Sequence, residues 1–273
     1  MNNAGRTILL ITPFFPPSSA AAVYRTWSLY TTLLARGWEC AVLTTEADDS
    51  RARDEAFLLG PEDEARVCRT PALSAKKLLS VKGRYVDALM TPDDMWPWAF
   101  LAYRAGKRLI KECRPDVIWS TYPIMSAHFL AYRLARWSKI PLVCDYQDPM
   151  VFHLVRKHSF RARRNHAIDR KVMQHSRATV FATEHAKQLY ARLYPEQQAN
   201  VHVIYNGFDE RFNQGQVGSD RADGGAFALH SGILYPGSSI RNPTPLFDAL
   251  RVLKSRSADG KPGLQMRFRG SGS

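Results

Sequence analysis

The chain has 273 residues, of which 45% are hydrophobic and 23% charged, a composition that is typical of a globular protein and excludes an intrinsically disordered one. No apolar run approaches the roughly 20 residues of a membrane-spanning helix, and the first residues lack the features of a signal peptide, so a cytoplasmic protein is expected. The 38 Lys and Arg outnumber the 25 Asp and Glu, and the net charge of +13 indicates an anionic partner: nucleic acid, phospholipid or a phosphorylated substrate.

The four cysteines are scattered and form no C-x-x-C pair. Cys40 and Cys144 stand inside the apolar runs WECAVLTT and IPLVCDY, where a thiol behaves as a small hydrophobic group. Reduced core cysteines are therefore predicted, in keeping with a reducing compartment.

Apolar segments typical of β-strands alternate with helix-like segments along the chain. In residues 21–36, Val23, Trp27 and Tyr30 recur at spacings of four and three, and Gly37 follows as a stop signal. Further helices are expected over 100–113 and 126–139, and the expected strands are 6–14, 38–45, 116–122, 140–148, 177–185 and 201–206. This alternation predicts an α/β fold, with a parallel sheet covered by helices on both faces.

The composition changes at residues 213–226, which are polar, rich in glycine and almost free of apolar side chains. This stretch is typical of a linker, and it divides a first domain (1–212) from a second region (227–273). The second region shows a strand, a Gly-rich loop, a helix and the start of another strand. One such unit cannot bury both faces of a sheet, so we expect the beginning of a second domain that is cut short.

Polar residues follow several of the expected strands, and parallel α/β sheets bind ligands beyond the carboxyl ends of their strands. These residues are Arg25, Tyr122, His128, Gln147, Asp148 and Asn206. A structural explanation is open for several of them, because the Asp-Pro and Asn-Gly dipeptides fit exposed turns and His128 fits a surface or supporting position. Asp145, inside a strand, also fits a structural role. The sequence contains no P-loop, G-x-G-x-x-G or nucleophile elbow.

Residues 156–171 hold seven Lys or Arg against one Asp, and Phe160, Ile168 and Val172 have helical spacing. A basic amphipathic helix of this kind is typical of contact with an anionic membrane surface, and a solvated helix face is the alternative. The histidines of this region lack a metal-ligand spacing, so no metal site is predicted. Nucleic-acid binding is not expected, because the aromatic residues follow core periodicity instead of interleaving with the basic ones.

Seven segments occur in order along the chain: TPFFPPS, LARGWECAVLT, PDDMWPW, STYPIMSAHFLA, IPLVCDYQDPM, VIYNGFDE and HSGILYPGSSIRNP. Together they resemble glycosyltransferase family 4-like proteins, and the resemblance extends from residue 6 to residue 270. It implies a retaining, nucleotide-sugar-dependent enzyme of the GT-B fold, which has two Rossmann-like domains, acting in surface polysaccharide synthesis. It implies no cofactor beyond the donor substrate.

The resemblance also implies roles for individual residues. On the acceptor side of the interdomain cleft it places Pro17, Arg25, Tyr122, Gln147 and Asn206. Gln147 stands where many relatives carry a basic residue, so the positive charge of that position is missing here. Asp148 matches the family's Asp-Pro segment. Asp148 and His128 are the expected catalytic residues. The residues expected to bind the donor are Gly232, Arg241 and Asn242.

The family's second domain carries a Glu-x7-Glu motif that binds the donor, yet no Glu follows Glu210 in this chain. A truncated form is therefore expected, comprising the acceptor domain and the start of a second Rossmann-like domain. The expected partners are a nucleotide-sugar donor and a glycan or lipid-linked acceptor, at the inner face of the plasma membrane. The alternatives are a non-catalytic module that binds an acceptor or a partner, and a GT-B sugar-nucleotide epimerase.

Overall fold

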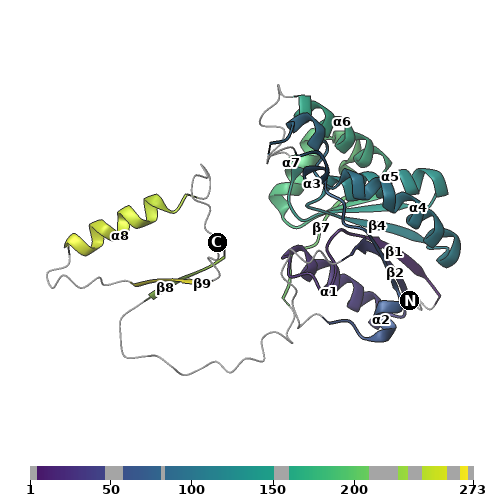
Figure 1. Ribbon diagram of the computed structural model, residues 1–273, viewed down its shortest axis with the longest axis horizontal. Helices are drawn as coiled ribbons and strands as arrows, with labels where there is room; N and C mark the ends of the chain where they lie inside the picture. The colour runs from purple at the N-terminus through teal and green to yellow at the C-terminus, as the bar shows by residue number, and fades with distance from the viewer. Residues whose placement is uncertain are drawn as a thin grey trace. The chain divides into compact units, whose positions relative to one another are not determined.

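The computed structural model describes residues 5–46, 58–80, 84–150, 160–208, 227–232, 242–256 and 265–269 (Figure 1). The chain divides into two compact units, Met1–Asn213 and Gln214–Ser273. Each unit is described by itself below.

The first unit is built on a seven-stranded sheet with the strand order β3-β2-β1-β4-β5-β6-β7. All neighbouring strands in it are parallel. The strands are β1 (Thr7–Ile11), β2 (Glu39–Thr45), β3 (Val67–Thr70), β4 (Val117–Tyr122), β5 (Leu142–Tyr146), β6 (Ala178–Phe181) and β7 (Val201–Val203). The strand order reverses between β1 and β4, and open α/β sheets bind ligands beyond the carboxyl ends of strands at such a reversal.

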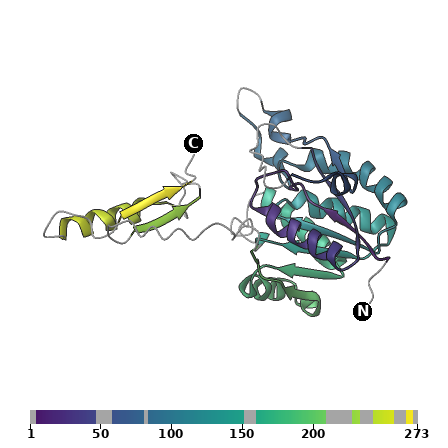
Figure 2. The ribbon, with the colours of Figure 1, turned by 90° about the horizontal axis from the view of Figure 1, so that it is seen from below.

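Helices cover both faces of this sheet, as predicted. They are α1 (Ala22–Ala35), α2 (Pro61–Ala65), α3 (Ala75–Leu79), η2 (Asp87–Met90), α4 (Trp96–Cys113), α5 (Met125–Ser138), α6 (Phe160–His175), α7 (Glu184–Leu193) and η4 (Pro195–Asn200). In Figures 1 and 2, α1 lies on one face of the sheet, and α4 and α5 lie on the other. The predicted α/β class, with a Rossmann-like parallel sheet, is confirmed.

The core consists of two apolar clusters, one on each face, because successive residues of a strand point to opposite faces. Leu9 and Ile11 of β1 pack into the larger cluster, together with side chains of α4 and α5. Ile8 and Leu10 pack into the smaller cluster, together with Tyr30 of α1. A strand that is buried on both faces reads as a continuous apolar run, which is why β1 is visible in the sequence.

Two local predictions are confirmed. Helix α1 ends beside Gly37, whose φ of +78° belongs to the left-handed region that glycine adopts without strain. Cys40 and Cys144 are buried free thiols. Burial raises the pKa of both thiols to about 12, so neither is a reactive thiolate at neutral pH.

The edge strand β3 was not predicted from the sequence. Four residues are too few to show a periodicity, and Arg69 gives this strand a charged side chain. The Arg69 guanidinium donates hydrogen bonds to the Pro16 carbonyl and the Glu64 carboxylate, both at 2.9 Å. The strand is therefore tied to the loop after β1, which a local pattern does not reveal.

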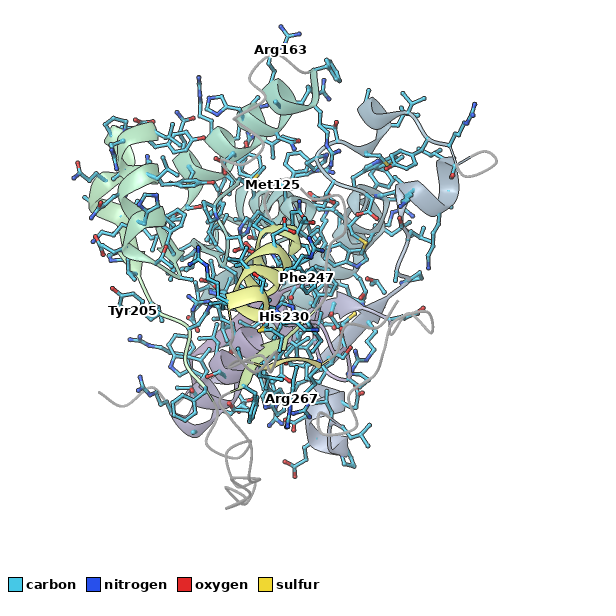
Figure 3. All side chains as sticks on the ribbon, turned by 90° about the vertical axis from the view of Figure 1, so that its left-hand side faces the viewer. Met125, Arg163, Tyr205, His230, Phe247 and Arg267 are labelled. Atoms are coloured by element: carbon cyan, nitrogen blue, oxygen red, sulfur yellow. The ribbon has the colours of Figure 1, made fainter. Side chains whose placement is uncertain are left out.

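The second unit contains a parallel strand pair, β8 (Phe227–Ser231) and β9 (Gln265–Arg269), and the helix α8 (Thr244–Arg256). The Phe268 ring lies 5.8 Å from the rings of His230 and Phe247, the last two labelled in Figure 3. None of the side chains described in this unit is buried. The predicted linker over 213–226 lies outside the described residues.

Candidate functional site

A pocket of about 1040 Å³ opens in the first unit, between α1 and the segment that follows β7. Its floor is the α1 face of the sheet, where β4, β5 and β6 each contribute one residue. Aromatic rings form much of its lining, and a polar cluster lies among them. The aromatic residues are Tyr24, Trp27, Trp119, Tyr205 and Phe208, and the polar cluster is Arg25, Asp145, Gln147 and Asn206.

A bidentate ion pair holds the polar cluster together. Arg25, in the first turn of α1, donates from Nε and Nη2 to the two carboxylate oxygens of Asp145 in β5, both at 2.8 Å. Their side chains are only 12% and 2% exposed. Burial raises the pKa of the Asp145 carboxyl above its usual value, and the Arg25 guanidinium offsets part of that rise.

The same guanidinium connects the ion pair to the segment after β7. Arg25 Nη1 donates to Asn206 Oδ1 at 3.0 Å. Tyr205 and Phe208 flank Asn206 in this segment and are 68% and 79% exposed, and Figure 3 shows Tyr205 pointing outward. One arginine therefore joins three segments: α1, β5 and the chain beyond β7.

Gln147 extends the cluster to the neighbouring strand. Its Nε2 donates to Thr121 Oγ1 in β4 at 2.9 Å and to the Ala22 carbonyl at 3.3 Å. A hydrogen bond from Thr121 also lowers the pKa of the Asp145 carboxyl, although less than burial raises it. A neutral amide suits this position, because it adds no second cation beside Arg25.

His128 lies in the core and not on the pocket wall. It is fully buried on the α5 face of the sheet, with its ring 4.5 Å from that of Tyr146 and Nδ1 2.7 Å from Ser120 Oγ. Burial lowers the pKa of His128 to about 3, so the imidazole is neutral at physiological pH. His128 is not among the residues that line the pocket, and its catalytic role stays a prediction.

The other acceptor-side residues lie outside the pocket lining. Asp148 is exposed in a bend just after β5, and Pro17 is half-buried in the loop after β1. Tyr122 ends β4, but its side chain lies outside the described part of the structure. The structure thus brings Arg25, Gln147 and Asn206 together.

The residues predicted to bind the donor belong to the second unit. Gly232 follows β8 with a φ of +143°, and its backbone N–H donates to the Arg269 carbonyl at 3.0 Å. Asn242 Oδ1 accepts from the Thr244 backbone N–H at 3.0 Å, at the start of α8. Arg241 lies outside the described residues.

The central residue of the cluster, Asp145, was weighed in the sequence only as a structural residue. The available signal was a charged side chain inside the apolar run IPLVCDY. A buried carboxylate is costly without a partner, so that signal indicates a distant cation. It does not identify Arg25, which is 120 residues away in the chain.

Comparison with known proteins identifies one protein family. The chain matches the model of Glycosyltransferase Family 4 over residues 22–212. A search of curated protein sequences finds no match.

Solved structures with this fold include HepE from Anabaena, crystallised with UDP and with UDP-glucose. The UDP complex is 13% identical, with a TM-score of 0.53, and the match covers 96% of this chain and 60% of HepE. A sucrose-phosphate synthase from Thermosynechococcus elongatus is 12% identical, with a TM-score of 0.58, over 98% of this chain and 71% of that one.

A UDP-GlcNAc 2-epimerase from Methanocaldococcus jannaschii is 13% identical, with a TM-score of 0.50, over 98% of this chain and 74% of that one. Identities this low show a shared fold, and they confirm the prediction that the Rossmann-like sheet is of the GT-B type. The chain spans about 60% of the length of HepE.

Proposed function

Because the chain belongs to glycosyltransferase family 4, we propose that it takes part in transferring a sugar from a nucleotide-sugar donor to a glycan or lipid-linked acceptor. The observation that carries this proposal is the family match over residues 22–212, a range that contains almost the whole lining of the pocket. The complexes of HepE with UDP and UDP-glucose support a uridine diphosphate sugar as the donor class.

We assign the pocket to the acceptor. Its volume of about 1040 Å³ is similar to that of small-molecule sites, and its aromatic rings and hydrogen-bonding groups suit the two sides of a sugar, apolar C–H faces and a hydroxyl rim. Arg25 and Asp145 satisfy each other, so their role is to hold α1, β5 and Asn206 in place around the ligand.

In the proposed reaction, the bond between the anomeric carbon and the donor diphosphate breaks while an acceptor hydroxyl oxygen bonds to that carbon, with retention of configuration. Asp148, an exposed carboxylate beyond β5, is proposed to face the acceptor hydroxyl and to accept its proton as the oxygen bonds to the anomeric carbon. The diphosphate is proposed to bind where Gly232, Arg241 and Asn242 precede α8, because backbone N–H groups and a guanidinium stabilise departing phosphate oxygens.

Release of UDP from UDP-glucose in the presence of candidate acceptors tests the proposal, and the anomeric proton of the product tests retention by NMR. Asp148→Ala is expected to lower turnover by about a hundredfold or more, the usual contribution of a group that handles a proton in the reaction. Glu112→Gln on α4, an exposed carboxylate outside the pocket, is the matched control. Turnover like that of the wild type in Asp148→Ala would contradict its role.

One observation favours a second candidate function. The pocket is formed by the first unit alone, as a module that binds an acceptor or a partner without catalysis would require. Calorimetry with UDP and UDP-glucose separates the two functions, because micromolar binding of either nucleotide contradicts a module without a donor site. An epimerase would convert its nucleotide sugar without any acceptor, which NMR of UDP-GlcNAc incubated with the protein alone detects.

The setting that we propose is the cytoplasmic face of the plasma membrane, in surface polysaccharide synthesis. The net charge of +13 and the basic residues of 156–171 support contact with an anionic lipid surface. Among the helices described, none is long and apolar enough to cross a membrane.

A further inference from the structure

The basic helix α6 exposes charged side chains to the solvent, whereas its apolar side packs against the core of the first unit. Ala162, Val172 and Met173 are buried, and Ile168 packs against the larger core cluster. The exposed side carries Arg163, Arg164, Arg170 and Lys171. The predicted contact of this basic helix with an anionic membrane therefore depends on its charged side and on Phe160, which is 52% exposed, and further apolar anchors have to come from elsewhere.

A cluster of exposed apolar side chains lies in the segment between β3 and the first turns of α4. We call this cluster the apolar patch; its members are Leu78, Tyr85, Val86, Leu89, Trp96 and Phe100. Val86 and Phe100 are 61% and 66% exposed, and it is the grouping of such residues, not the exposure of any one, that points to an interaction surface. Trp96 and Phe100 are one helical turn apart and lie on the same side of α4.

Hydrogen bonds hold the segments of the apolar patch together. Trp96 Nε1 donates to the Leu89 carbonyl at 2.9 Å, which joins α4 to η2. The start of α3 is tied to the loop before α4, since the Ser74 hydroxyl donates to the Asp94 carboxylate at 2.9 Å. The apolar patch therefore belongs to a folded platform and not to a loose loop.

Basic side chains surround the apolar patch. Lys76 Nζ lies 5.5 Å from the centre of the Tyr85 ring, and Lys77 and Arg84 are exposed beside it. Arg104 follows Phe100 by one turn of α4 and is also exposed. Aromatic rings bordered by lysine and arginine are typical of protein surfaces that bind at the water–lipid boundary.

Helix α6 adjoins this platform. It contacts η2, and Asn165 Nδ2 of α6 donates to the Pro92 carbonyl at 3.0 Å. Arg163 and Arg164 are on the exposed side of α6, and Figure 3 shows Arg163 pointing away from the sheet. The charged side of α6 and the apolar patch thus lie next to each other on the first unit.

We propose that the apolar patch and the exposed side of α6 form one docking surface for an anionic lipid membrane. The apolar patch inserts its side chains at the boundary of the acyl chains, and Arg163 and Arg164 contact lipid phosphates, each contributing about fivefold to binding. This docking surface extends the membrane contact of the proposed function, but it does not require catalysis. Charge complementarity selects anionic lipid as the occupant, because cations border the apolar patch on both α4 and α6.

Sedimentation of the full chain with vesicles tests the charged part of the docking surface. We expect binding to vesicles that contain phosphatidylglycerol and none to pure phosphatidylcholine vesicles. The double variant Arg163→Glu/Arg164→Glu is expected to weaken binding by more than about tenfold. Arg6→Glu/Lys111→Glu, both exposed and outside the docking surface, makes the same change in net charge and is the matched control. If both double variants lost vesicle binding equally, the proposal would be overturned, because binding would then depend on net charge and not on the docking surface.

Lipids with brominated acyl chains, which quench nearby tryptophan fluorescence, test the apolar part. Trp96 and Trp137 are equally exposed, at 38% and 40%, but Trp137 lies on α5 outside the apolar patch. Trp96→Phe is expected to remove most of the quenching, and Trp137→Phe to leave it unchanged. The reverse result would overturn the proposal.

The substitution Phe100→Ser provides a further test, because this exposed side chain is removed without opening the core. We expect it to abolish the part of vesicle binding that survives high salt. If the wild type forms a dimer and Phe100→Ser abolishes it, the proposal would be overturned, because the apolar patch would then bind a second copy of the chain. Asp148→Ala is expected to bind vesicles like the wild type, so a failure of the enzymatic proposal and a failure of membrane docking give different results.

Discussion

Arg25 and Asp145 show how single residues shape the pocket, because their side chains are only 12% and 2% exposed and each satisfies the other. Removing one partner of a buried ion pair leaves the other as an uncompensated charge, which costs about 3–5 kcal/mol. Arg25→Met is therefore expected to lower the free energy of unfolding by about that amount, and urea denaturation measures it. Arg25→Met/Asp145→Asn should recover part of the loss. Strictly additive effects of the two substitutions would show that the pair is not coupled.

Asp169 of α6 is a second buried carboxylate, and it accepts hydrogen bonds from the hydroxyls of Tyr146 at 2.7 Å and Tyr194 at 2.8 Å. Burial raises the pKa of Asp169 to about 6, compared with about 3.9 in an unfolded chain. The native state thus holds this proton more tightly. Its stabilising effect is fully present below about pH 4 and is lost as the pH rises through about 6.

Asp169→Asn removes this proton equilibrium. The wild type is expected to lose more unfolding free energy than Asp169→Asn between about pH 5 and about pH 7.5, by roughly 1 kcal/mol, because part of the loss has already occurred at pH 5. Urea unfolding at the two pH values measures this difference. The same pH dependence in both proteins would contradict the raised pKa.

At the scale of elements, the sheet is covered by helices that approach each other closely. Gly106 lies in α4, where a Cβ would meet Leu134 Cδ1 of α5 at 2.5 Å and Leu43 Cδ2 at 3.2 Å. Leu134 is itself fully buried, so it has little room to move away. The small residue at this position permits the contact between α4 and α5.

Gly106→Ala tests that contact. Alanine favours a helix by about 1 kcal/mol, but overpacking costs about 1–3 kcal/mol, and the crowding on two sides leads us to expect a net loss of about 1 kcal/mol. Thermal unfolding measures it, and Leu134→Val in the same chain should restore part of the loss. The control is Gly60→Ala, where a Cβ meets nothing within 4 Å. If Gly106→Ala stabilised the protein, Leu134 of α5 would have to move away from the new Cβ at little cost, and the expectation would be wrong.

At the scale of the whole molecule, the two units differ in how much they bury. The first contains both core clusters, whereas none of the side chains described in the second is buried. Two strands and one helix without a buried face are only marginally stable in water. Amides of β1 and β4 are therefore expected to exchange hydrogen much more slowly than those of β8, β9 and α8.

Hydrogen exchange followed by mass spectrometry of the full chain measures this difference. Adding UDP-glucose is expected to slow exchange around β8 and α8 if the donor binds there. Protection of the second unit equal to that of β1, without any ligand, would contradict the expectation, because it would require burial of the side chains that are exposed here.

The elements were predictable where their signals are local. Strands β1, β2, β4 and β5 are apolar runs of five to seven residues, and the segments between them repeat their apolar residues at helical spacing. Both patterns are formed by residues that are neighbours in the chain, so both can be recognised from the sequence. The edge strand β3 gave no such signal, because it is short and carries Arg69. The protein family could also be predicted from the sequence, because the resemblance depends on the order of the segments along the chain and not on contacts between them.

The site divides in the same way. The sequence by itself determined which polar residues follow the strands, because parallel strands of an α/β sheet place their carboxyl ends at one edge. Only the tertiary structure decided that Asp145 pairs with Arg25, that His128 is in the core and that α6 turns its apolar side inward. These outcomes depend on which face of the sheet each side chain meets and on strand order, and both are set by contacts between residues far apart in the chain.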